Sequence, residues 1–182
     1  MKDNDKVLIQ ELKKQIKEEI LKELEDKQKN VVLKVKKLPN FSGGEIKYQT
    51  PGSVGLDLRA SIVDPNTKKP ATITILPGCV EAIPLGIAVQ IPDGYEMQIR
   101  TRSSLSLTRI TVENSPGTID QDFRNQLMAI IANDRIKPYS VENGDRICQA
   151  IIAPAVRCKI EYVDELSETE RGANGFGSTG LK

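Results

Sequence analysis

Turn-forming pairs of proline, glycine, aspartate and asparagine interrupt residues 50–145 so often that long helices have no room there. The runs between these turns are short and rich in β-branched residues, and residues 87–91 alternate as a half-buried strand does. Many short strands without intervening helices predict an all-β fold, a jelly-roll-like sandwich or barrel. The expected strands are 31–35, 71–76, 80–83, 87–91, 96–100, 127–132, 147–153 and 156–163.

Residues 1–29 differ from the rest because they contain no glycine or proline and are dominated by lysine, glutamate, leucine and isoleucine. Apolar residues recur among them at spacings of three and four, which predicts one amphipathic α-helix ahead of a β core of residues 30–166. This helix could pack on its own core or fray in solution, it could associate with other copies in an oligomer, or it could dock on another macromolecule. The apolar stripe consists of Ile9, Leu12, Ile16, Ile20 and Leu24.

Residues 167–182 lose the strand pattern and are rich in glycine, which predicts a flexible arm. Glycine lets backbone amides approach an anion closely, Arg171 adds charge, and Ser178 and Thr179 add hydrogen-bond donors. Phe176 could stack on a planar base. The alternative is a disordered tail that binds nothing.

Composition excludes several classes of function. The chain has no histidine, which removes Ser-His-Asp and Cys-His nucleophiles and every His-ligated metal site. Its three cysteines have no CxxC spacing, so we expect neither zinc nor a disulfide framework and place the chain in a reducing, intracellular setting. A net charge of +1 and the lack of a long apolar run predict no nucleic-acid and no membrane partner.

Two segments combine glycines or hydroxyls with charge. Asp57, between two leucines, could be a buried structural aspartate, or it could hold Mg²⁺ through water. Arg102 with the hydroxyls of Ser103 and Ser104 suits phosphate oxygens, although an exposed turn with incidental charge has the same composition.

Two further segments surround turns. A Pro-Gly pair lies between residues 111–112 and 118–119, which predicts a β-hairpin that could face a ligand, and Asp120 just beyond it could act as a general base on water. Acids beside turns are also common on plain surfaces. In residues 144–149, Asp145 and Arg146 could form an ion pair that anchors a turn, and Gln149 alternates as a strand residue does.

Together and in this order, the five segments resemble the motifs of the trimeric dUTP pyrophosphatase (dUTPase) family over residues 31–180. The most specific are Arg-Gly-x-x-Gly-Phe-Gly-Ser-Thr-Gly at residues 171–180 and Gly-Asp-Arg-Ile-x-Gln at residues 144–149. The resemblance implies a jelly-roll homotrimer with three active sites shared between subunits. It also implies Mg²⁺-dependent hydrolysis of dUTP to dUMP and pyrophosphate, which keeps uracil out of DNA and supplies dUMP for thymidylate synthesis.

The resemblance also implies a role for each matching residue. Asp120 would orient and deprotonate the attacking water, Gln149 would hold that water or the adjacent phosphate, and Asp57 would contact the metal through water. Asp145 and Arg146 would support the trimer contact. The residues expected to bind the phosphates are Arg102, Ser103, Ser104, Arg171, Gly177, Ser178 and Thr179. Those expected to bind the base and sugar are Asn114, Gly117, Thr118, Ile119, Phe123, Met128 and Phe176.

Three positions depart from the family pattern. Phe123 stands where most members have a tyrosine under the deoxyribose, and Ser104 and Asn125 stand in place of glycines. Two other functions fit parts of the sequence. A dCTP deaminase or bifunctional enzyme on the same fold would need a glutamate near Ile130, and a non-catalytic protein that binds a regulator would not need the acids and the arm.

Overall fold

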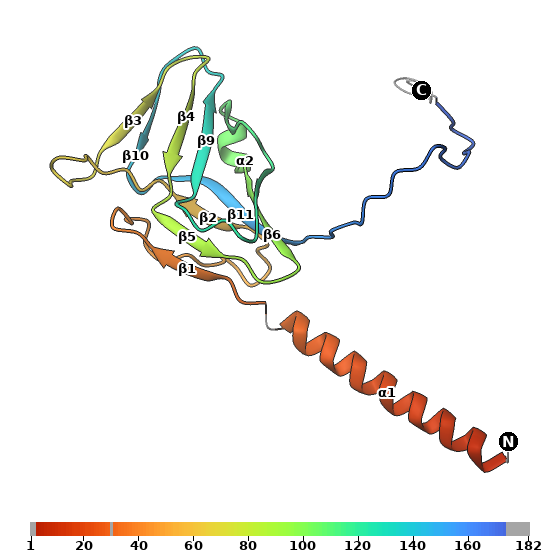
Figure 1. Cartoon of the computed structure of the whole chain (residues 1–182). Coiled ribbons are helices and arrows are strands. Elements are labelled where there is room, and N and C mark those ends of the chain that lie inside the picture. Colours follow the sequence, from red (N-terminus) through yellow and green to blue (C-terminus); the bar gives the residue numbers. More distant parts are fainter. Residues whose placement is uncertain (1–2, 30, 174–182) are drawn as a thin grey trace.

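The computed structural model describes residues 3–29 and 31–173, with the side chains of residues 9–23 and 31–173. Helix α1 (Asp3–Lys29) leads into a body of antiparallel strands with one short helix, α2 (Ser103–Ser106), and Figure 1 shows α1 extending away from that body. The all-β prediction and the N-terminal helix are therefore confirmed. None of the helices in the described chain combines the length and apolar character that a membrane crossing requires.

The strands form two larger sheets and two pairs, all antiparallel. The larger sheet has the order β2 (Leu56–Arg59), β11 (Arg146–Pro154), β6 (Tyr95–Arg100) and β8 (Gly117–Ile119). The second has the order β4 (Val80–Pro84), β9 (Met128–Asn133) and β7 (Ile110–Val112). The pairs join β1 (Lys34–Lys37) to β5 (Ile87–Gln90) and β10 (Tyr139–Glu142) to β3 (Thr72–Ile75).

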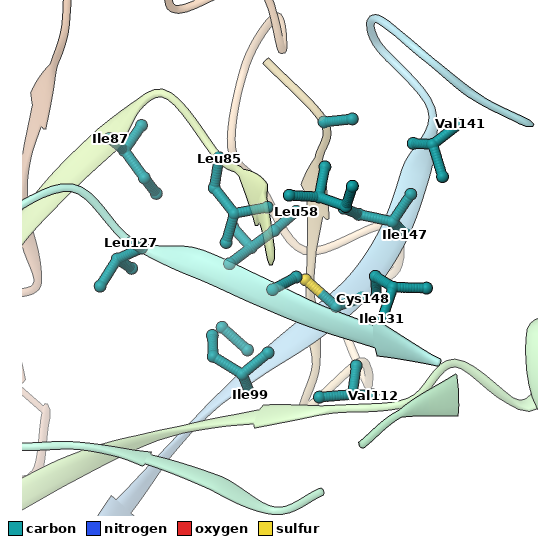
Figure 2. Close-up of a cluster of buried hydrophobic side chains, with 14 of the residues drawn as sticks. Leu58, Leu85, Ile87, Ile99, Val112, Leu127, Ile131, Val141, Ile147 and Cys148 are labelled. Carbon is teal, nitrogen blue, oxygen red and sulfur yellow. The ribbon is translucent and has the colours of Figure 1, made fainter. Parts of the chain in front are cut away.

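The core lies between these sheets (Figure 2). Leu58 on β2 and Cys148 on β11 point toward the strands that carry Ile131 and Val112, and all four side chains are buried. The alternation of buried and partly buried residues along β2 follows from the period of two that a strand imposes on its side chains. The sheets thus bury one apolar face each, as in a sandwich.

Two predicted strands differ from the structure. The first strand covers Lys34–Lys37 instead of residues 31–35. Residues 156–163 are extended but pair with no strand of the described chain, and Figure 1 shows this segment running away from the sheets. The exposed fractions of Val156, Ile160 and Tyr162 are 94%, 72% and 96%. A β-rich sequence pattern specifies a strand only where the segment lies along a partner edge, and this segment pairs with no edge among the described residues.

Candidate active site

Asp57 binds two arginines at one end of the larger sheet. Its Oδ1 accepts a hydrogen bond from Arg102 Nε at 2.8 Å, and its Oδ2 accepts one from Arg146 Nη1 at 3.0 Å. The Asp57 side chain is only 14% exposed, and Arg102 Nη1 also donates to the Arg146 carbonyl oxygen at 3.1 Å. Two guanidinium charges against one carboxylate leave the cluster with a net positive charge, which suits phosphate oxygens.

The ion pair between Asp145 and Arg146, one possible interpretation of this turn, does not form, because Arg146 binds Asp57. Asp145 Oδ2 accepts a hydrogen bond from the Glu142 backbone N–H at 2.9 Å, and so closes the turn that precedes β11. Gly144 in that turn has a φ of +93°, a conformation that a residue with a Cβ rarely adopts. The turn therefore owes its shape to Asp145 and Gly144, and it delivers Arg146 to the site.

Gln149 lies beside the cluster, since β11 places it opposite Asp57 on one side and Arg100 on the other. Its Nε2 donates to the Thr101 carbonyl oxygen at 3.0 Å, and Gly55 leaves the space that its amide occupies. Gln149 thus fixes the backbone that leads directly into Arg102.

Thr101 is a positioning residue that the sequence analysis missed. Besides accepting from Gln149, it accepts a hydrogen bond at Oγ1 from the Val112 N–H at 2.8 Å, and its own N–H donates to Ser115 Oγ at 3.3 Å. It therefore ties three of the motif segments together. A threonine between two arginines gives no pattern from which that role could be read.

The predicted hairpin around the Pro-Gly turn is wrong in its pairing. Strand β7 pairs with β9 and strand β8 pairs with β6, so the turn carries the chain from one sheet to the other. Gly117 begins β8 and lies against the Asn114 side chain, since a Cβ there would lie 2.8 Å from Asn114 Nδ2. Strand β8, with Thr118 and Ile119, is the last strand of its sheet, so its outer edge carries backbone groups that no strand of the described chain pairs.

Asp120 lies far from the arginine cluster within one copy of the chain. The register pairs Gly117 with Ile99 and Ile119 with Met97, which puts Asp120 beside Glu96. Gln149 stands beside Arg100, four residues further along β6, or about 13 Å at the rise of a strand. Asp120 and Asp57 also line separate cavities, each of about 430 Å³.

The other candidate residues lie on the surface, near the arginine cluster or near Asp120. Ser103 and Ser104 begin α2 and are exposed, next to Arg102. Phe123 and Met128 are 40% and 37% exposed. Arg171 is exposed. The remaining residues of the arm, which are Phe176, Gly177, Ser178 and Thr179, lie outside the described residues.

Cys148 lies on the opposite face of β11 from Gln149 and is fully buried. Burial, with a contribution from the Asp57 charge, raises the pKa of its thiol to about 12. The thiolate that a nucleophile or a metal ligand needs is therefore scarce at neutral pH.

The residues offer no complete protein cage for a metal. Among the described residues, no group of three or more histidine, cysteine, aspartate or glutamate side chains is placed to hold an ion. Both oxygens of Asp57 are engaged by arginines. This donor set fits Mg²⁺ only in the mode in which the ion keeps its waters and is bound largely through substrate phosphates.

Comparison with known proteins identifies the family. Residues 43–180 match the dUTPase family. The chain belongs to the dUTPase family. It is 46% identical to the deoxyuridine 5'-triphosphate nucleotidohydrolase of Rickettsia massiliae over 150 residues, which cover 82% of this chain and 97% of that protein. The same enzyme of Treponema denticola is 47% identical over 136 residues, covering 74% of this chain and 90% of the relative.

Solved structures agree with these relatives. The dUTPase of Staphylococcus bacteriophage 80alpha, determined with dUPNHPP, superposes with a TM-score of 0.70 at 26% identity, covering 82% of this chain and 99% of that one. The family match and the named relatives show that this dUTPase hydrolyses dUTP. The predicted enzyme class is therefore confirmed, and neither the deaminase nor the non-catalytic alternative gains support.

Proposed function

We propose that this dUTPase hydrolyses dUTP at a site in which Asp120 activates the water. Asp120 takes a proton from that water, whose oxygen bonds to the α-phosphorus. The bond from this phosphorus to the bridging oxygen then breaks, and pyrophosphate leaves with the electron pair. Gln149 holds the water or the adjacent phosphate. Its position beside the arginine cluster supports this role.

The observation that carries the proposal is the cluster of Asp57, Arg102 and Arg146 in a chain of this family. Asp57 holds the Arg102 guanidinium in one orientation, and a fixed guanidinium binds phosphate oxygens without the cost of ordering it first. Ser103 and Ser104 add exposed hydroxyls beside it. Mg²⁺, bound with the triphosphate, would supply further charge neutralisation, and the Asp57 carboxylate would face its hydration shell.

We further propose a homotrimer in which copies share each site. The separation of Asp120 from Asp57 and Arg102 within one copy supports sharing, since no single copy brings base and phosphate site together. Residues 156–162 support an exchange of strands between copies. Apolar and charged side chains alternate along this extended segment, its apolar side is exposed, and it lacks a partner strand in the described chain.

The base and sugar would be read at the outer edge of β8. Backbone groups of Gly117, Thr118 and Ile119 would pair with uracil, and Asn114 would support the turn that leads into the strand. A fixed pattern of donors and acceptors rejects cytosine because a mismatched base leaves polar groups unpaired. Phe123 would exclude a ribose 2′-hydroxyl by its bulk, with Met128 near the sugar.

The arm would close over the bound nucleotide. Phe176 would stack on uracil while Arg171, Gly177, Ser178 and Thr179 hold the γ-phosphate, which excludes water and strengthens each charged contact. A reducing, intracellular setting suits the three cysteines, which are all free. The phage dUTPases are described as controlling the transfer of virulence genes. For this chain a regulatory protein partner stays a hypothesis.

The first test is pyrophosphate release with Mg²⁺ from dUTP, dCTP, dTTP and UTP, measured side by side. Release from dUTP alone is expected. Release from none of the four would overturn the proposed function, and release from dCTP at the rate of dUTP would contradict the proposed reading of uracil.

The role of Asp120 is tested by Asp120→Asn with Asp122→Asn as the matched control, since both carboxylates are exposed and lie two residues apart. Asp120→Asn should lose about 10³-fold in kcat, a typical contribution of a positioned general base, and still bind dUTP. Asp122→Asn should keep its turnover. Equal turnover in the two variants would refute the assignment of the base.

A further inference from the structure

Helix α1 carries an apolar stripe that nothing in the described chain covers. Ile9, Leu12, Ile16 and Ile20 are 39–53% exposed, and Figure 1 shows the helix standing clear of the sheets. The family match begins at residue 43, so α1 lies outside the matched residues. An amphipathic helix gains most of its stability by packing its apolar face against another surface. We therefore expect a partner to cover this face.

The charges beside the stripe indicate which partner fits. At 100° per residue, Glu19 lies along one edge of the stripe, and Lys13 and Lys17 lie along the other. In a parallel bundle around a rotation axis, the acidic edge of each helix faces the basic edge of the next. Antiparallel packing would bring the lysines of one helix beside those of the other, which is unfavourable.

We propose that α1 packs through this stripe against α1 of the other copies, in parallel, as a three-helix bundle. The number three rests on the proposed homotrimer; the parallel self-association rests on the charge pattern. Helices of this length associate weakly as free peptides. Here only residues 30–33 separate α1 from β1. Helices tethered so closely to one assembly meet at effective concentrations on the order of millimolar.

The test uses neighbouring residues on different faces of the helix. Ile20 belongs to the stripe and Leu21 does not, yet they are 51% and 49% exposed. In full-length protein with both exposed cysteines replaced by serine, Ile20→Cys should form an interchain disulfide under mild oxidation at least about tenfold faster than Leu21→Cys, because bridged Cα atoms must approach within roughly 7 Å. Ile9→Cys should also bridge to its own counterpart, which only parallel packing allows.

Three outcomes would overturn the proposal. The first is an equal rate for Ile20→Cys and Leu21→Cys. The second is bridging at Ile20 without bridging at Ile9, and the third is a rate that falls in proportion to protein dilution, which would mean contact between separate assemblies. A molar mass other than three chains by light scattering would overturn the three-helix stoichiometry. The cysteine variants should turn over dUTP at the rate of the unmodified enzyme. If the unmodified enzyme itself does not hydrolyse dUTP, the proposed function fails, but the α1 bundle does not.

Discussion

Replacing Asp57 by asparagine should destabilise the fold and the phosphate site together. The substitution removes the one negative charge between Arg102 and Arg146 and leaves two guanidinium groups facing each other. Breaking a fully buried ion pair costs about 3–5 kcal/mol. Arg102 is 20% and Arg146 is 43% exposed, so solvent screens part of that cost. We therefore expect a loss of about 2–3 kcal/mol in the free energy of unfolding, or about 5–10 °C in Tm for a chain of this size.

The matched control is Glu45→Gln. Glu45 forms a 3.1 Å ion pair with Lys47, but the two side chains are 75% and 61% exposed, so its loss should cost at most about 0.5 kcal/mol. Urea unfolding followed by circular dichroism at equal protomer concentration compares the variants, and buffer with EDTA isolates the ion pair from any effect of Mg²⁺. If Asp57→Asn and Glu45→Gln unfold at the same urea concentration, the arginine cluster does not stabilise the fold as argued.

The remaining predictions concern packing, the buried thiol and the sugar. Gly86→Ala should cost about 2–4 kcal/mol by urea unfolding, because Gly86 has a φ of +67° and a Cβ there would meet Ser61 at 2.6 Å; Gly94→Ala, with a φ of +78° and open space around it, should cost about 1 kcal/mol. Because burial raises the pKa of Cys148 to about 12, the neutral thiol favours the folded state. That stability is full below pH 9 and is lost as pH rises from 9 toward 12. A thiol reagent at pH 8 should leave Cys148 unlabelled in folded protein and should label it after denaturation. Phe123→Ala should reduce the preference for dUTP over UTP by about tenfold or more in kcat/KM, while Phe123→Tyr should keep it.

Local patterns in the sequence predicted many of the elements, but they missed strands β2 and β10 and helix α2. The helical stripe predicted α1, and the Pro-Gly and Asn-Gly turns separated strands that the structure contains. What those patterns could not predict were pairings between distant residues. Arg102 and Arg146 lie 45 and 89 residues from Asp57 along the chain, and no local signal marks them as partners. The error over the hairpin has the same origin, because a turn signal predicts a reversal but not which sheet the next strand joins.

The strand register explains why the proposed site needs more than one copy of this dUTPase. Asp120 and the arginine cluster lie at opposite ends of β6, and their spacing is set by the hydrogen-bonded pairs that join β6 to β8 and β11. A slip of one residue would turn buried Met97 and Ile99 outward, so the register cannot shift to bring the two groups together. The proposed catalysis therefore requires Asp120 of one copy beside the arginine cluster of another. Any feature that holds copies together, the proposed α1 bundle included, would then protect turnover at low protein concentration.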